Sequence, residues 1–448
     1  MVGTRQGCML SPFLFVMFLN EYIRLLTTNN CQGIYVTEIL SNLLVLLYAD
    51  DMNNMSDTVG HLQHQVNTLS QFCNNYGMRI NTLKTKVMVF RNGGIVKMNE
   101  KWWYEGRSLA VTPYYDYLGL TVSSRMKWGK AKRNLCNKAK KAFGLIKLFE
   151  KIYNNSDPGL SFFLFDSMVA PILLYGAEIW GGEYCEVIER VHAQFCKYVV
   201  NIGSHATNVA ALGECGRLPL FVEYFSKCIK YWVKIISMNE ERYPKQCYYM
   251  SRHLDDNNRV NWTTNIKNIL FKFGFGEVWL SQNIGDPSYF MLVFKDRLTA
   301  CATQDWHSAV TSSDKLTNYS EFKSLLDLEL YLKVVPQKKY VQALARLRCS
   351  NHDLMIEKGR HLNVPKHERF CSYCRVNGLL LIETEYHFVM ECKLYSDIRK
   401  DLIMKHMGDV NKYNFINLMR TKNVSTLQHL SHFVYLAFNL RREFLSNQ

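Results

Sequence analysis

Two adjacent aspartates, Asp50 and Asp51, follow a short apolar run at residues 43–48, with Ala49 between. Two carboxylates on one tight turn repel each other unless a cation neutralises them, and carboxylate oxygens are suitable ligands for Mg²⁺. In a two-metal site such ions activate an attacking hydroxyl group and stabilise a leaving pyrophosphate. Because aspartate is also a favoured turn residue, the pair by itself is better explained as a turn.

A second group of chemically active residues has the spacing Cys-x₂-Cys-x₁₂-His-x₄-Cys. Its members are Cys371, Cys374, His387 and Cys392. The spacing predicts a tetrahedral, structural Zn²⁺ site, and with four protein ligands no position stays open for catalysis. The alternative is a chance cluster of buried thiols in a chain with 14 cysteines, but the spacing favours zinc. The other cysteines are scattered through the chain, which indicates reduced thiols and an intracellular compartment.

The elements around the two aspartates predict an α+β unit. Ser11 is suited to cap a helix with Pro12 at its first position. Because residues 13–26 are apolar on nearly all sides, we expect this helix to be buried. The run at 43–48 predicts a strand buried on both faces, and a second strand is expected to return over 52–55.

An amphipathic helix comes next along the chain. Asp57 or Thr58 is expected to cap it, and Gly77 to close it. Further strands are expected at 78–81, 87–90 and 117–122. The α+β unit therefore ends near residue 125.

The remainder of the chain is basic and predominantly helical in pattern. Within about six helical turns there are eight cationic residues: Lys127, Lys130, Lys132, Arg133, Lys138, Lys140, Lys141 and Lys147. Helical periodicity dominates to about residue 360. The predicted fold class is therefore α+β, with the strands confined to the first part of the chain.

Composition narrows the possible classes of protein. With 448 residues, 48% of them hydrophobic, and only 24 Gly and 9 Pro, the chain is neither disordered nor collagen-like. The net charge of +15 favours an anionic partner, either nucleic acid or an acidic membrane surface. The closest candidate for a membrane span, at 162–180, contains Asp166, Pro171 and Glu178, so we expect no membrane partner.

Four short motifs occur along the chain in an order that favours a chemical role for the aspartate pair over a simple turn. They are Gly3-Thr-Arg-Gln-Gly-Cys-Met-Leu-Ser-Pro12, Tyr48-Ala-Asp-Asp51, Gly77-Met-Arg-Ile-Asn-Thr-Leu-Lys-Thr-Lys86 and Tyr117-Leu-Gly119. In this order and spacing the sequence resembles the reverse transcriptase family, most closely the polymerases of non-LTR (LINE-type) retrotransposons. The resemblance implies part of a polymerase palm over the first 125 residues.

The first two motifs carry template and metal contacts in that family. The resemblance assigns the contact with template and incoming nucleotide to Arg5, Gln6 and Gly7. It assigns Asp50 and Asp51 as ligands of the catalytic Mg²⁺.

The third and fourth motifs imply contacts with triphosphate and primer. Lys84 is placed near the incoming triphosphate, where it donates a proton to the pyrophosphate or neutralises it. Tyr117, Leu118 and Gly119 correspond to the primer grip. A solvated lysine and an ordinary strand aromatic remain the alternatives for Lys84 and Tyr117.

The resemblance also points to a missing part. The family's first catalytic aspartate lies on a strand upstream of the Arg-Gln-Gly segment, with the fingers further upstream. We therefore expect the C-terminal portion of a longer polymerase, with an incomplete two-metal site. Asp166 resembles the missing strand only superficially, because it follows Asp50 in the chain.

By resemblance the chain divides into five parts: a partial palm at 1–125, a helical thumb-like region at 126–240, a helical connector at 241–365, a zinc knuckle at 366–400 and a helical tail at 401–448. Lys130, Lys132 and Arg133 are the thumb residues we expect to neutralise phosphates, with a solvated helix face as an equal alternative. Around the knuckle, the candidate phosphate contacts are Arg360, Lys366, Arg369, Arg375 and Lys393.

The intact family enzyme extends a DNA 3′ end on an RNA template. The implied partners are an RNA template, a DNA primer or target, and deoxynucleoside triphosphates, and the implied location is nuclear. We expect this chain alone to be weakly active or inactive. The alternatives are a non-catalytic nucleic-acid-binding protein and a retrotransposon relic, and the sequence leaves the oligomeric state open.

Overall fold

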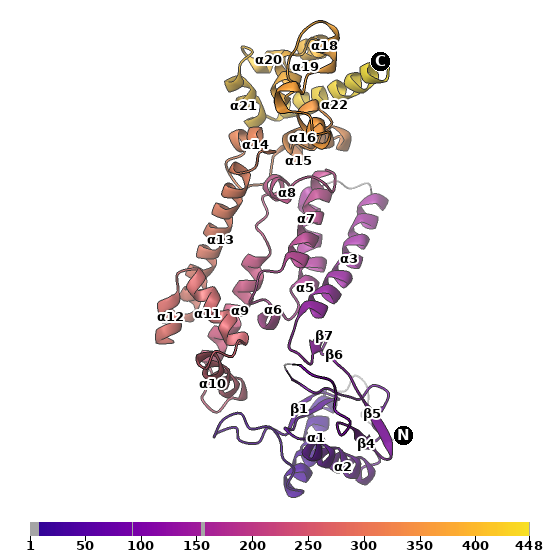
Figure 1. Ribbon diagram of the computed structural model, residues 1–448, viewed down its shortest axis with the longest axis vertical. Helices are drawn as coiled ribbons and strands as arrows, with labels where there is room; N and C mark the ends of the chain where they lie inside the picture. The colour runs from indigo at the N-terminus through magenta and orange to yellow at the C-terminus, as the bar shows by residue number, and fades with distance from the viewer. Residues whose placement is uncertain (1–8, 92, 154–156, 448) are drawn as a thin grey trace. The chain divides into compact units, whose positions relative to one another are not determined.

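The computed structural model describes residues 9–91, 93–153 and 157–447 (Figure 1). The contacts between residues group the chain into two compact units, and segments of the two units alternate along the sequence. Unit 1 takes the described residues up to Asn134, together with Glu178–Gly182 and Cys228–Gly285. Unit 2 takes Leu135–Ala177, Glu183–Lys227 and the described residues from Asp286 onward. The fold is α+β and mostly helical, with its named strands between residues 45 and 123.

Unit 1 contains every named strand. Its elements are α1 (Ser11–Thr28), β1 (Val45–Tyr48), β2 (Asp51–Asn54), α2 (Val59–Asn75), β3 (Lys86–Val87), β4 (Trp102–Tyr104), β5 (Arg107–Val111), β6 (Tyr114–Tyr117), β7 (Leu120–Ser123), α10 (Tyr243–Asp256), α11 (Trp262–Lys272) and α12 (Gly276–Ser281). Three helices run across the boundaries between the units: α3 (Gly129–Ile152), α6 (Ala177–Trp180) and α9 (Phe221–Ile236).

The described part of unit 2 is helical. Its elements are α4 (Pro158–Leu164), the π-helical turn η1 (Phe165–Val169), α5 (Ala170–Leu173), α7 (Glu186–Val200), α8 (Asn208–Cys215), α13 (Pro287–Thr311), α14 (Thr317–Phe322), α15 (Tyr331–Val334), α16 (Lys338–Arg348), α17 (Met355–His361), η2 (Lys366–Glu368), α18 (Ser372–Val376), the π-helical turn η3 (His387–Glu391), η4 (Lys393–Tyr395), α19 (Ser396–Leu402), α20 (Met404–Met407), α21 (Lys412–Arg420) and α22 (Val424–Ser446).

Helix α2 lies between two apolar cores of unit 1. On one side, Leu69 and Phe72 pack with α1 and with the β1–β2 hairpin. On the other side, Val66 packs with Trp102 and Leu109 of a sheet with strand order β3-β5-β4. The predicted ends of α2 are confirmed. Thr58 accepts a hydrogen bond from the backbone N–H of His61, and Gly77 follows the helix with φ of +67°.

The prediction that the first helix is buried is wrong. Helix α1 begins at Ser11 with Leu10 rather than Ser11 as its N-cap. Only one stripe, including Leu19 and Tyr22, is buried, whereas Phe13 and Met17 are more than half exposed. The physical reason is that α2 and the β1–β2 hairpin cover only one side of α1.

The prediction of a strand buried on both faces is also wrong. Strands β1 and β2 pair in antiparallel register, so alternate residues face opposite sides. Val45, Leu47 and Met52 pack on the core, whereas Leu46 and Tyr48 are 40% and 64% exposed. The hairpin therefore packs on the core with one face, and its other face is the more exposed one.

The later strands differ from the expected ones. Residues 78–81 form no strand, and β3 covers only Lys86–Val87 of the strand expected at 87–90. The single strand expected at 117–122 is a hairpin instead, because Leu118 and Gly119 both have positive φ (+48° and +82°) and turn the chain between β6 and β7. Strands β4 and β5 were not predicted.

A buried ion pair joins α8 to α16 within unit 2. Arg348 of α16 donates to both carboxylate oxygens of Glu214 of α8, at 2.9 and 3.1 Å, and to the backbone carbonyl of Met419 of α21, at 2.5 Å. Arg348 and Glu214 are both buried, so neither charge is left without a partner in the interior. The same helix, α16, packs along α22.

Candidate functional site

The β1–β2 hairpin presents Asp50 and Asp51 to solvent. Tyr48 pairs with Asp51, so the turn consists of Ala49, with φ of +51°, and Asp50. Asp51 shares the outer face of the hairpin with Tyr48, and both aspartates are exposed. Within the described ranges, neither carboxylate has a hydrogen bond or an ion pair. Two unneutralised carboxylates therefore stand together where a cation in solution can reach them.

Buried polar contacts fix the far end of this hairpin. Tyr22 donates its hydroxyl proton to Asn54 Oδ1 over 3.1 Å, and burial raises the pKa of Tyr22 above its ordinary value, which keeps the donor proton in place. The side-chain amide of the buried Gln65 donates to the carbonyls of Met55 and Gln32, both at 2.8 Å. The hairpin thus has a rigid base beneath an exposed tip.

The Asn-x-x-Lys-Thr segment forms a closed turn that exposes Lys84. Asn81 Oδ1 accepts from the backbone N–H groups of Leu83 and Lys84, at 3.1 and 3.2 Å, and Thr85 donates to the Asn81 carbonyl at 3.0 Å. Ile80, just before the turn, packs against both apolar cores, so it ties this segment to the core beneath the hairpin. The Lys84 side chain is exposed and has no ion pair among the described residues.

The Tyr117–Gly119 segment forms the tip of the β6–β7 hairpin. Asp116 and Thr121 are hydrogen-bonded across it, and Thr121 Oγ1 accepts from Asn134 of α3 at 2.9 Å. The ammonium group of Lys130, also on α3, lies 4.0 Å from the ring centroid of Tyr114. The start of α3 is therefore joined to this hairpin by both an amide and a cation–π contact.

The three expected phosphate contacts on α3 differ in their surroundings. Lys130 lies over Tyr114, Lys132 lies 5.4 Å from the ring centroid of Trp180, and Arg133 is exposed. Arg5, Gln6 and Gly7 lie outside the described residues. Asp166 is held by two hydrogen bonds from Arg217, at 2.8 and 2.5 Å, within unit 2.

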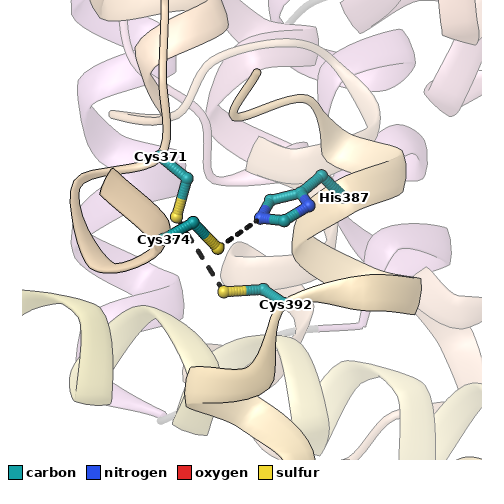
Figure 2. A group of neighbouring side chains, drawn as sticks. All are labelled: Cys371, Cys374, His387 and Cys392. Carbon is teal, nitrogen blue, oxygen red and sulfur yellow. Dashed lines mark hydrogen bonds between the residues drawn. The ribbon is translucent and has the colours of Figure 1, made fainter. Parts of the chain in front are cut away.

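The Cys/His group comes together as the spacing predicted. Figure 2 shows the side chains of Cys371, Cys374, His387 and Cys392 pointing toward a common centre. All four are buried, and their ligand atoms lie within 4.8 Å of one another. Cys371 Sγ lies 3.9 Å from Cys392 Sγ, and Cys374 Sγ lies 3.4 Å from His387 Nε2. This set could hold a metal ion.

Short elements on both sides of a β-bridge position these ligands. Phe370 and Ile382 form the bridge, which closes the loop that carries α18. Cys371 precedes α18 and donates its N–H to the Leu381 carbonyl at 2.8 Å, and Cys374 lies within α18. His387 opens η3, and Cys392 follows that turn directly.

A further layer of contacts orients the ligands. His387 Nδ1 lies 3.1 Å from a carboxylate oxygen of Glu391, so Nε2 is the nitrogen that faces the three sulfurs. The buried Arg399 donates to the carbonyls of Val389 and Cys392, both at 2.8 Å. A hydrogen bond with the Cys392 thiol lowers the pKa of Cys371 below its ordinary value, which favours a thiolate at that position.

Sequence reasoning missed Glu391 and Arg399. The i,i+4 spacing from His387 to Glu391 was a usable signal, because residues four apart share one face of a helical turn. Nothing local to the sequence pointed to Arg399.

Two of the five cations expected around the knuckle are engaged internally. Arg369 donates to the carbonyls of Val364 and Ile356, at 3.0 and 2.8 Å. Arg360 pairs with Glu357 at 3.0 Å. The other three, Lys366, Arg375 and Lys393, are exposed, and no ion pair holds them among the described residues.

Throughout the described ranges, the Cys/His group is the only close set of three or more potential metal ligands. Asp50 and Asp51 are therefore joined by no third described carboxylate at this spacing. None of the described helices has the length and apolar character needed to cross a bilayer.

Comparison with known proteins bears on the N-terminal part of the chain. Residues 1–122 match the family described as reverse transcriptase (RNA-dependent DNA polymerase), which confirms the resemblance carried by the four motifs. A probable RNA-directed DNA polymerase from transposon BS of Drosophila melanogaster is 23% identical over 185 residues, which make up 40% of this chain and 20% of that protein. The RNA-directed DNA polymerase from mobile element jockey, from the same organism, is 24% identical over 190 residues, or 40% and 19% of the two chains. The match thus spans about a fifth of the length of these curated relatives.

Proposed function

We propose, from the match of residues 1–122 to reverse transcriptases, that this chain is part of an RNA-directed DNA polymerase of a non-LTR retrotransposon. In intact form such an enzyme extends a DNA 3′ end along an RNA template with deoxynucleoside triphosphates. The observation that carries the proposal is the exposed Asp50–Asp51 tip of a hairpin whose other end is fixed by buried contacts within the matched region.

Each site residue would have a separate role. Asp50 and Asp51 would hold Mg²⁺, which supplies positive charge to activate the primer hydroxyl group and stabilise the leaving pyrophosphate. Lys84, exposed on its closed turn, would donate a proton to that pyrophosphate or neutralise it. The Tyr117–Gly119 turn would contact the primer, and Arg5, Gln6 and Gly7 the template and nucleotide.

Primer extension on an RNA template with Mg²⁺ tests this assignment. Any incorporation should fall at least about 100-fold in Asp50→Asn, since the loss of a metal ligand removes charge stabilisation of the transition state. The matched control is Asp256→Asn, at an exposed carboxylate that ends α10.

Incorporation that survives Asp50→Asn would overturn the role of the aspartate pair. Incorporation that Asp50→Asn abolishes and Asp256→Asn leaves unchanged would support that role.

We further propose that the Cys/His group holds structural Zn²⁺. A tetrahedral site with Zn–S bonds of about 2.3 Å and a Zn–N bond of about 2.05 Å requires S···S and S···N separations of about 3.8 and 3.6 Å. The separations of 3.9 Å between Cys371 and Cys392, and 3.4 Å between Cys374 and His387, match these values.

Metal analysis of the purified chain tests the zinc site. We expect one zinc per chain, lost in Cys374→Ser but retained in Cys301→Ser, a thiol outside the group. A strong chelator should speed hydrogen exchange at the amides of Cys371 and Leu379, whose hydrogen bonds hold the loop between the ligands. Full zinc content in Cys374→Ser would contradict the assignment.

A second candidate function is nucleic-acid binding without catalysis. It is favoured by the exposed cations near the Cys/His group, Lys366, Arg375 and Lys393. Equal, salt-sensitive binding of a primer–template duplex by the wild-type chain and Asp50→Asn, with no incorporation by either, would support it.

A further inference from the structure

A cavity between α16 and α22 lies outside both sites described above. Its empty volume is about 610 Å³, including the space open to solvent. Lys339 and Arg346 line it from α16, and Tyr435, Phe438 and Arg442 line it from α22.

Positive charge exceeds negative charge in this cavity. Among the described residues, neither Lys339 nor Arg442 takes part in an ion pair; Arg442 donates instead to the Phe438 carbonyl and the Asn439 amide oxygen. Arg346 contacts Asp353 at 3.4 Å, an exposed pair of little strength. The remaining cation, Arg441, is fully neutralised by two short hydrogen bonds to the buried Glu383.

Aromatic rings form one wall of the same cavity. Phe438 is stacked on Phe388 with a centroid distance of 4.8 Å, and Tyr435 packs against Tyr340 at 5.2 Å. The Lys339 ammonium group lies 5.0 Å from the Tyr435 ring centroid. The cavity thus places uncompensated cations beside a fixed aromatic surface, and nucleotides present a phosphate and a flat base in just this combination.

We propose that this cavity binds a nucleotide, with its base against Tyr435 and Phe438 and its phosphate between Lys339 and Arg442. The nucleotide belongs either to a single-stranded nucleic acid or to a free mononucleotide. The site lies wholly within unit 2 and requires no polymerase activity, so it goes beyond the proposed function.

Binding of fluorescein-labelled decauridylate to the full chain tests the proposal. We expect Lys339→Gln/Arg442→Gln to weaken binding about tenfold. The number of counterions released on binding, read from the salt dependence of the affinity, should fall by about two. Because exposed lysines elsewhere also attract nucleic acid, the matched control is Lys400→Gln/Lys405→Gln, which removes the same charge from α19 and α20 outside the cavity. The control should stay within about twofold of the wild-type affinity.

A second variant and a cross-linking experiment test the aromatic wall separately from the cations. Tyr435→Leu retains every cation, so we expect weaker binding with an unchanged salt dependence. A decamer carrying 5-iodouridine should cross-link to the peptide at 435–442. Circular dichroism and retained metal content check that each variant is folded.

Competitors separate the two sources of nucleotide. Displacement by micromolar uridine monophosphate identifies a mononucleotide site, and displacement by unlabelled oligonucleotide alone identifies a single-stranded polymer. Inorganic phosphate that competes as well as uridine monophosphate would overturn the role of the aromatic wall. Wild-type affinity in Lys339→Gln/Arg442→Gln, with no cross-link at 435–442, would overturn the proposal whatever the result of primer extension.

Discussion

At the scale of single residues, Glu391 has the clearest indirect role. It holds His387 through Nδ1, which leaves Nε2 directed at the three sulfurs. A carboxylate in this position fixes the tautomer of the imidazole and increases its basicity toward a metal. Glu391 is itself partly exposed, whereas His387 is buried.

We therefore expect Glu391→Gln to lower zinc affinity by about 10- to 100-fold while leaving the fold intact. Competition with a chromogenic chelator measures the change. Glu368→Gln is the matched control, because Glu368 is exposed and contacts His367 rather than a member of the ligand set. Equal affinities in the two variants would show that Glu391 does not orient the imidazole.

At the scale of elements, α2 determines where the candidate catalytic segments lie. One side of it carries α1 and the β1–β2 hairpin, and the other carries the β3-β5-β4 sheet. Its C-terminal end leads directly into residues 78–85, which contain Asn81 and Lys84. The stop at Gly77, with φ of +67°, therefore sets the start of the Lys84 turn relative to the hairpin.

Two glycine substitutions should change stability in opposite directions. Gly77→Ala should destabilise the chain by about 1 kcal/mol, because a side chain disfavours the left-handed conformation. Gly144→Ala should stabilise it by about 1 kcal/mol, because Gly144 lies inside α3 with open space at its Cβ position. Urea unfolding of both variants measures the two shifts, and shifts of the same sign would contradict this account.

At the scale of the whole molecule, unit 1 is assembled from segments far apart in sequence. Thr37 donates to Gln246 at 2.6 Å, and the indole N–H of Trp262 donates to the Glu178 carbonyl at 2.9 Å. Residues 228–285 therefore complete the unit that contains the aspartate hairpin. The five sequential parts expected from the resemblance stay a prediction.

Truncation distinguishes interleaved units from sequential parts. A chain ending at residue 285 retains all segments of unit 1, whereas a chain ending at 227 lacks the last of them. We expect hydrogen-exchange protection at residues 31–43 to be retained in the longer chain and reduced in the shorter one, because the partner of Thr37 is then lost. Equal protection in both chains would favour the sequential division.

The sequence by itself determined the features that depend on neighbouring residues. The Asp50 turn, the Thr58 cap, the Gly77 stop and the grouping of Cys371, Cys374, His387 and Cys392 follow from spacing within short segments of the chain, because turns, caps and Cys/His groups of this kind each involve one continuous segment. The motif order was also sufficient to indicate the reverse transcriptase family, which the comparison confirmed over residues 1–122.

Only the tertiary structure decided which surfaces are covered. The apolar runs in α1 and β1 cannot reveal that each packs on one side, because burial depends on which distant elements reach them. The same holds for Gln246, whose partner Thr37 lies 209 residues away, and for the cavity between α16 and α22. Long-range packing, unlike a turn or a cap, has no signature in the local order of residues.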